Sequence, residues 1–329
     1  MLNVNFPKGK TVAALAACVT FAPFAAIAQA YPAKPVRIIT QFAAGSGGDL
    51  AVRIAAAFTA ENLGQPMVVE NRAGGGGMVA AEAVARSPSD GYNLLAATPA
   101  TQVMRVFMPN TSIDPVKDFQ PITAISQSMA AIISHPNFPA NNMAELVAYA
   151  KKNPGKISFG TSGIGTEHHL SAEQISTLAG INMVHVPYKS GIQAMNDVIA
   201  GQMPISFSIT GPIIGPARAG KLKVIAVVSE KRYVRLPDVG TVLDGVPGFV
   251  PIFGWTGLFA PAGLPQPVLR RLSSDTVKAI TSPEGRTKLF DAGFDVLGNT
   301  PEEFTLMIQR QIELVGKILK TTGLKLAEQ

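Results

Sequence analysis

Short apolar runs that read as β-strands alternate with stretches of helical spacing along most of the chain, and this alternation restricts the fold more than any other feature. Residues 36–42 read as a buried strand, and residues 49–62 follow with Leu50, Ile54 and Phe58 near helical spacing. A strand, a helix and a second strand in succession favour a crossover between parallel strands. The sequence therefore predicts an α/β fold whose first sheet is parallel and has helices on both faces.

The alternation begins again near residue 130 and continues to the C-terminal region. The predicted strands are 36–42, 67–70, 93–97, 130–134, 157–160, 184–187, 205–207, 224–228 and 253–259. The predicted helices are 49–62, 78–86, 143–151, 167–179, 192–199, 213–219, 265–280, 283–292 and 301–320. About 300 residues exceed one ordinary domain, so this restart indicates a second lobe.

The last predicted strand and the helices after it have no sheet of their own, and the simplest arrangement returns them to the first sheet. We therefore expect two doubly wound sheets joined by a two-segment hinge, with crossings near residues 119–126 and 250–255. The predicted divisions are a signal peptide over residues 1–30, a first lobe of residues 31–122 plus 253–329, and a second lobe of residues 123–252.

The first thirty residues have the features of a cleavable export signal. Lys8 and Lys10 precede an uncharged apolar stretch of residues 11–27, and small residues then lead to a predicted cleavage after Ala30. Cys18 ends a stretch that also fits a lipid-attachment signal, although the apolar region before it is only about seven residues long. We expect export to the periplasm as a released protein, with lipid anchoring at Cys18 as the alternative.

Charge and cysteine content exclude several classes of site. Cys18 is the only cysteine, so a chain cleaved after Ala30 has no disulfide, thiolate nucleophile or Cys-metal site. The formal net charge of +6 comes from scattered residues without a Lys/Arg-rich run. This pattern argues against nucleic acid as a partner, and it favours a weak positive field that helps to capture small anions.

Three glycine-rich loops follow predicted strands, where ligands bind in open α/β sheets and helix N-termini present unpaired N–H groups. Residues 42–48 form the first, and we expect Asp49 to be the N-cap of the helix that follows. Residues 74–77 are four glycines, which fit a flexible turn as well as a ligand cradle. Residues 160–166 carry hydroxyls and amides that suit a carboxylate, and their place in the second lobe predicts that they face residues 42–48 across a cleft.

The motifs of common enzyme classes are incomplete. Gly160 and Ser162 begin like a nucleophile elbow, but Ile164 stands where a glycine is needed. His168 and His169 are adjacent, so on a helix their side chains diverge by about 100° and cannot share a metal ion. We expect one of them to pack near the loop and the other to be solvated. No catalytic residue, metal or cofactor is predicted; an exported hydrolase using Ser162 and a histidine is the competing hypothesis.

Motifs in one fixed order resemble those of the tripartite tricarboxylate transporter receptors, the TctC or Bug family. The matching stretches are residues 31–35, 42–49 with Arg53, 69–74, 82–85, 90–92, 160–170, 186–189, 219–223, 236–239 and 259–263. The resemblance covers nearly the whole chain after residue 30. It implies a two-lobed fold like that of type II periplasmic binding proteins, which closes on a carboxylated solute and delivers it to membrane permease subunits. We expect a monomer, and a ligand-presenting subunit of a membrane sensor is the alternative role.

The resemblance also implies which residues contact the ligand, through main-chain amides and ordered water on both sides of the cleft. The expected ligand-binding residues are Phe42, Ala43, Ala44, Gly45, Ser46, Gly47, Thr98, Thr161, Ser162, Gly163, Gly165, Thr166, His169, Tyr188, Lys189, Ser190 and Ser208. The chain departs from the family pattern at residues 43–46, at Pro204 and at Ser208. Because the last two replace residues that are often acidic in the family, we expect a plain carboxylate rather than an amino acid.

Overall fold

The computed structural model of the chain describes residues 1–2, 31–102 and 112–322. The predicted signal peptide, its cleavage after Ala30 and Cys18 lie outside the described residues. The described part is a mixed α/β fold with two separate sheets, as predicted. None of the described helices combines the length and the hydropathy that a membrane crossing requires.

The first sheet has six strands and is parallel on one side only. Its strands are β1 (Val36–Thr40), β2 (Met67–Asn71), β3 (Asn93–Ala97), β4 (Phe119–Ser128), β10 (Gly254–Pro261) and β11 (Phe294–Val296), in the order β11-β4-β10-β3-β1-β2. β1 pairs in parallel with β2 and β3, whereas β10 runs antiparallel to both β3 and β4. The predicted return of the chain to the first sheet is confirmed, because β10 lies between β3 and β4.

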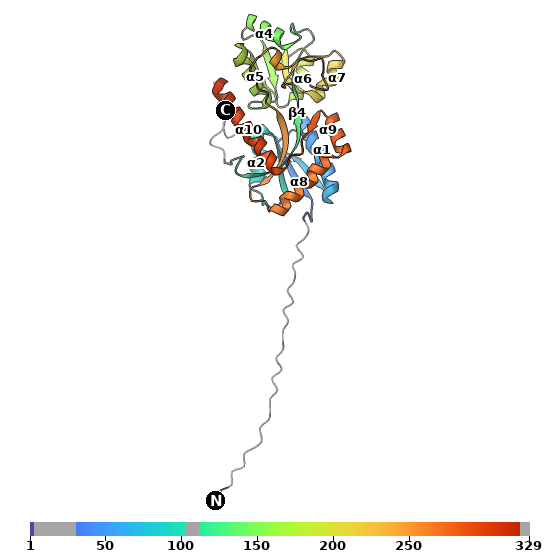
Figure 1. The fold of residues 1–329 in the computed structure, drawn as a ribbon, viewed down its shortest axis with the longest axis vertical. Helices are drawn as coiled ribbons and strands as arrows, with labels where there is room; N and C mark the ends of the chain where they lie inside the picture. The colour runs from blue at the N-terminus through green and yellow to red at the C-terminus, as the bar shows by residue number, and fades with distance from the viewer. Residues whose placement is uncertain (3–30, 103–111, 323–329) are drawn as a thin grey trace. The chain divides into compact units, whose positions relative to one another are not determined.

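Two groups of helices cover the two faces of the first sheet (Figure 1). The helices are α1 (Gly47–Leu63), α2 (Met78–Ala85), α8 (Gln266–Thr281), α9 (Pro283–Asp291) and α10 (Pro301–Thr322). Ile38 of β1 packs in one core with α1, α8 and α9, and its neighbour Ile39 packs in the other with α2 and α10. Successive residues of a strand point to opposite faces, so the continuous apolar run of β1 fills both cores.

The second sheet has five strands and its own four helices. The strands are β5 (Ala130–Ser134), β6 (Ser158–Thr161), β7 (Val184–Pro187), β8 (Ile205–Ile209) and β9 (Lys223–Val227), in the order β7-β6-β8-β5-β9. The helices are α4 (Met143–Lys152), α5 (Glu167–Ala179), α6 (Gly191–Ile199) and α7 (Thr210–Arg218). The cores on the two faces place α4 and α5 with Ile132, and α6 and α7 with Ile133 (Figure 1).

The chain passes from the first sheet to the second at Met129, between β4 and β5, and returns after the short helix η2 (Val242–Asp244) by entering β10. Residues 119–126 were expected only as a crossing, but β4 pairs with β10 from Phe119 to Ser128. The expected lobe boundary after residue 122 falls inside this strand. The division into lobes remains a prediction, and the pairing of β4 favours a first crossing at Met129.

Candidate functional site

In both sheets, helices begin at the carboxyl ends of parallel strands, which is where open α/β sheets bind ligands. α1 follows β1, and α5, α6 and α7 follow β6, β7 and β8. The two sets of loops come into contact where α1 begins and β8 ends. A Cβ built on Gly47, the first residue of α1, would lie 2.7 Å from Cδ1 of Ile209, the last residue of β8.

Residues 42–48 lead into α1 through a hydrogen-bonded turn in which Ala43, Ala44 and Gly45 are exposed. Ser46 is the N-cap of α1, and its hydroxyl accepts the Asp49 N–H at 3.4 Å. The prediction that Asp49 is the N-cap is therefore wrong, because the helix begins two residues earlier than expected. Asp49 lies in the first turn and reaches back, where its Oδ2 accepts the Gly45 N–H at 2.9 Å.

The Asp49 carboxylate is turned away from the loop surface and is fully engaged by donors. Its side chain is 4% exposed and accepts from Arg53 Nε at 3.0 Å and from Asn71 Nδ2 at 2.7 Å. Burial raises the pKa of the Asp49 carboxyl, but hydrogen bonds from Arg53, Asn71 and the Gly45 N–H outweigh burial and hold the pKa below its ordinary value. The first donors of α1, at Gly47 and Gly48, have no partner within the helix, so this end of α1 suits an anion.

The tetraglycine loop of residues 74–77 is built for close approach rather than for flexibility alone. All four glycines have positive φ, from 55° to 139°, and Gly75–Gly77 form the short helix η1. A Cβ on Gly77 would collide with Thr101 Oγ1 and would lie 2.6 Å from Gln41 Oε1. Gln41 also donates from Nε2 to Thr98 Oγ1 at 3.0 Å and accepts the Thr98 N–H. Gln41 was expected only as part of the strand of residues 36–42.

Residues 160–166 form a tight loop held by hydroxyl groups. Thr161 Oγ1 lies 2.7 Å from His185 Nε2 and accepts the Gly163 N–H at 3.2 Å. Thr166 is the N-cap of α5, and its hydroxyl donates to the Gly163 carbonyl at 2.7 Å. Ser162 Oγ lies 3.0 Å from His168 Nδ1. These contacts fix the loop so that part of its backbone can face a ligand at the start of α5.

Three buried or half-buried imidazoles support this loop. His169 Nδ1 accepts the Gly165 N–H at 3.2 Å, and its ring stacks on His185 at 4.0 Å between centroids. Burial lowers the pKa of His169 and of His185 to about 4, and in His169 the neighbouring His185 adds to the effect. Burial also lowers the pKa of His168, against an opposing effect of Glu167. All three rings are therefore neutral at pH 7.

The expectation that one of the adjacent histidines is solvated is wrong, because His168 and His169 are only 3% and 4% exposed. Their side chains point in different directions, but both are buried. His169 lies against His185 of β7. Glu167, the residue before them in α5, lies against Gly254 of β10.

Ser162, His168 and Glu167 are the residue types that serve as nucleophile, base and acid in a catalytic triad. Their geometry does not form such a triad. His168 Nε2 is 3.9 Å from Glu167 Oε1, beyond hydrogen-bond distance. Nδ1 rather than Nε2 faces the serine, the reverse of the usual triad arrangement. A buried imidazole with a lowered pKa is also a poor base, so the arrangement suits positioning better than proton transfer.

The remaining candidate residues lie around the start of α6. The Tyr188 hydroxyl donates to Asp197 at 2.7 Å, and burial, followed by Asp197, raises the pKa of Tyr188 to about 12. Lys189 is exposed, and Ser190 is the N-cap of α6. Ser208 of β8 is buried, and its hydroxyl has no hydrogen-bond partner among the described residues. A Cβ on Gly191 would lie 3.7 Å from that hydroxyl, so Ser208 lies beneath the start of α6.

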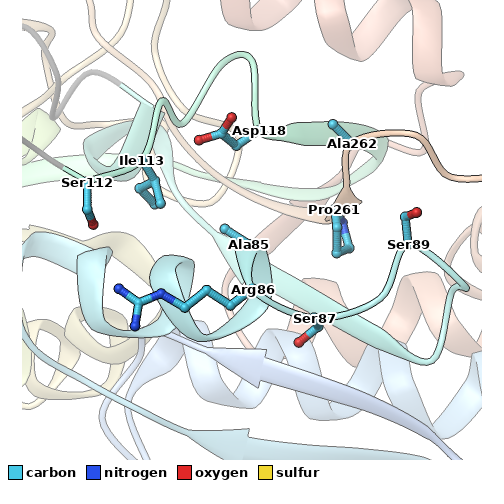
Figure 2. A pocket seen from close by; sticks show the side chains of 9 residues that line it. All are labelled: Ala85, Arg86, Ser87, Ser89, Ser112, Ile113, Asp118, Pro261 and Ala262. Atoms are coloured by element: carbon cyan, nitrogen blue, oxygen red, sulfur yellow. The ribbon is translucent and has the colours of Figure 1, made fainter.

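No cluster of three potential metal ligands occurs within residues 31–102 and 112–322. A hollow of about 390 Å³ lies where β3 and β4 begin and β10 ends, at the edge of the first sheet opposite to the loops described above. Figure 2 shows the side chains that line it. It is lined by Ala85, Arg86, Ser87, Ser89, Ser112, Ile113, Asp118, Pro261 and Ala262. None of the predicted site residues lines this hollow.

Residues 51–324 match the family described as the tripartite tricarboxylate transporter family receptor, TctC. Three solved structures are similar over nearly the whole chain. The periplasmic binding protein BugD is 33% identical, with a TM-score of 0.81, and covers 89% of this chain and 99% of its own. Rpa4515 of R. palustris, solved with adipate, is 28% identical, with a TM-score of 0.84 and coverages of 89% and 98%. MatC of Rhodopseudomonas palustris, solved with bound malate, is 26% identical, with a TM-score of 0.80 and coverages of 88% and 100%.

Proposed function

Because the chain belongs to the TctC family of tripartite tricarboxylate transporter receptors, we propose that it captures a small dicarboxylate between its two lobes and delivers it to membrane permease subunits. It does so as a monomeric periplasmic receptor without turnover, after export by residues 1–30. Adipate and malate, the acids in two related structures, are both dicarboxylates. A sensor role would use the same fold and site with a different membrane partner.

The observation that carries this proposal is that the carboxylate in the first turn of α1 is turned away from the backbone donors at the start of that helix. The nearest carboxylate in the first loop, Asp49, is turned inward onto Arg53, Asn71 and the Gly45 N–H. What remains at the loop surface is backbone, together with the first donors of α1. Such a set favours an anion through hydrogen bonds and the helix dipole.

The predicted site residues have four different roles under this proposal. Residues 42–47 and 161–166 present amides and hydroxyls to the two ends of the ligand. His169 supports the loop from behind, because its Nδ1 is taken by the Gly165 N–H. Thr98, Ser190 and Ser208 complete the floor of the site, and Tyr188 and Lys189 border it.

A thermal-shift and calorimetric screen of residues 31–329 against adipate, malate, citrate and a neutral sugar tests the proposal. A ligand present at 100 times its Kd stabilises the native state by about 2.7 kcal/mol, which is readily measured as a higher melting temperature. We expect one of the acids to bind and to be recovered unchanged. Stabilisation by the sugar alone, or consumption of the acid that Ser162→Ala abolishes, would overturn the receptor proposal.

Two glycine substitutions provide a matched pair for this screen. Gly47→Ala places a methyl group against Ile209 where the two sets of loops touch, whereas Gly316→Ala on α10 meets open space. We expect Gly47→Ala to weaken acid binding by about tenfold, the equivalent of about 1.4 kcal/mol. Gly316→Ala should leave the affinity unchanged. Equal affinities in the two variants would show that the ligand does not lie at this contact.

A further inference from the structure

The first side chain of α5 connects the second lobe to the strands that carry the crossings. Glu167 directly follows residues 160–166, and its side chain is 14% exposed. A Cβ built on Gly254 would collide with Glu167 Oε1 and would lie 2.7 Å from Ser128 Oγ. Gly254 begins β10 and Ser128 ends β4, and these two residues pair with each other. The Glu167 carboxylate thus lies against the start of β10, beside the residue with which β4 ends.

Through His168, Glu167 is also close to the loop of residues 160–166. His168 Nε2 lies 3.9 Å from Glu167 Oε1, and Nδ1 of the same ring lies 3.0 Å from Ser162 Oγ. His168 is buried, and its Nε2 has no hydrogen-bond partner among the described residues. Ser162, His168 and Glu167 therefore form a continuous row of polar side chains from the loop to the crossing strands.

The chain makes room for the Glu167 carboxylate by omitting a side chain at position 254. Any residue larger than glycine there would displace the carboxylate. The pairing of Glu167 with Gly254 indicates a role beyond filling space.

We propose that Glu167 is a positioning residue that couples the loop of residues 160–166 to β4 and β10. A displacement of Glu167 moves His168, and His168 moves Ser162. When the lobes change their spacing, β4 and β10 bend where they leave the first sheet, and Glu167 moves the start of α5 with them. The loop of residues 160–166 then takes its ligand-binding position only at the closed spacing. This deepens the proposed function, because it rests on residues 160–166 being part of the site.

A double-mutant cycle without ligand tests the contact itself. Gly254→Ala should lower the unfolding midpoint, because its methyl group displaces the Glu167 carboxylate. In a Glu167→Ala background the methyl group no longer meets the carboxylate and only the contact with Ser128 Oγ has to adjust, so the effect of Gly254→Ala should fall to less than about half, as expected for residues in direct contact. Gly316→Ala is the control and should have the same effect in both backgrounds. Additive effects of Gly254→Ala and Glu167→Ala would overturn the proposal.

The positioning role needs a readout that a merely structural residue would not change, and spin-label distances supply it. The sequence has no cysteine after Cys18, so Val68→Cys on β2 and Val184→Cys on β7, both exposed, can be labelled specifically. We expect Glu167→Ala to broaden the distance distribution between the two labels, and Glu167→Gln, which keeps the shape of the side chain, to restore it. An unchanged distribution in Glu167→Ala would show a purely structural role and overturn the proposal.

Titration of the same variants with adipate separates this proposal from the proposed function. If adipate binds, we expect Glu167→Ala to weaken it by about tenfold, within the usual range for coupled sites. Failure of every carboxylate to bind would reject the dicarboxylate receptor, and the label distances would then decide the role of Glu167. Normal adipate affinity in Glu167→Ala would reject the coupling alone.

Discussion

The two loops proposed to hold the ligand differ in how they are supported. Residues 42–48 are anchored by charges, because Asp49 draws in Arg53, Asn71 and the Gly45 N–H. Residues 160–166 are anchored by neutral groups, with Thr161 on His185 and Gly165 on His169. Two different supports thus hold loops that offer the same kind of neutral donor.

Solvent access explains the difference. The Arg53 side chain is 46% exposed, so the ion pair with Asp49 keeps one partner in water and avoids most of the desolvation cost of a buried pair. Thr161 and His169 are buried, and a charge there would lose its hydration without a nearby counter-ion. The more exposed loop can rely on ions, whereas the buried loop needs neutral hydrogen bonds and ring stacking.

Removal of the central anchor of the first loop should give the largest effect. Asp49→Ala leaves the Gly45 N–H, Asn71 and Arg53 without their acceptor, so we expect a loss of about 3 kcal/mol in the free energy of unfolding. Asp49→Asn keeps an acceptor oxygen and should lose less. Urea unfolding measures both. A loss below about 1 kcal/mol in Asp49→Ala would show that charge does not anchor this loop.

The two supports should respond to acid in different pH ranges. The pKa of His169 and His185 is about 4 in the folded protein and 6.5 unfolded, so the unfolded state binds more protons between these values. The stability from the rings is complete above pH 6.5 and is lost as the pH falls towards 4. The pKa of Asp49 is lowered, so its contribution is complete above its unfolded value of 3.8 and is lost only in stronger acid.

Hydrogen exchange measured from pH 7 to pH 4.5, corrected for the intrinsic pH dependence, should therefore show residues 160–169 losing protection before residues 42–48. After discounting for the half-exposed His185, we expect a loss of about 1–2 kcal/mol in global stability over this range. Glu173, 3.7 Å from His169 Nε2, has a pKa raised by burial and so opposes part of this loss. His185→Gln should reduce the pH dependence, with His135→Gln as control. Equal losses of protection in both loops would show that the two supports respond to acid in the same pH range.

The smallest expected difference lies in the helix caps. Ser46 and Thr166 each accept an N–H at 3.4 Å, but only the Thr166 hydroxyl also donates to a loop carbonyl, that of Gly163. Replacement of an N-cap hydroxyl by alanine costs about 1 kcal/mol. We expect Thr166→Ala to exceed Ser46→Ala by about 0.5–1 kcal/mol, the usual net contribution of a hydrogen bond. Calorimetric unfolding of the two variants measures the difference, and the reverse order would contradict it.

Much of the fold could be predicted because its strands and helices have strong local patterns. Residues 93–97, 130–134 and 184–187 are strands at the predicted bounds, and residues 167–179 are a helix at the predicted bounds. β11 was missed because three residues, Phe294–Val296, are too short to show a period. The start of α1 was misplaced because Ser46 and Asp49 are both favoured N-cap residues, and only tertiary contacts select between them.

Glycine and hydroxyl content predict residues 42–48 and 160–166 as ligand loops, and their part in binding stays a prediction. The contacts that support these two loops could not be predicted. The roles of Gln41 and His185 depend on partners 57 and 24 residues away, and no local pattern carries that information. His169 is buried against His185 of β7, and His168 is buried with its Nδ1 facing Ser162. Periodicity along the sequence does not reveal such packing.

The position of β10 between β3 and β4 also determines the order in which the chain can acquire its structure. The second sheet is complete once residues 130–227 are available, whereas β4 has no neighbour in its own sheet until residues 254–261 arrive. Pairing over so long a sequence separation costs loop-closure entropy before its contacts form. On a chain emerging from its N-terminus, the middle segment is therefore able to fold first. The sheet that contains the N-terminal strands is completed last.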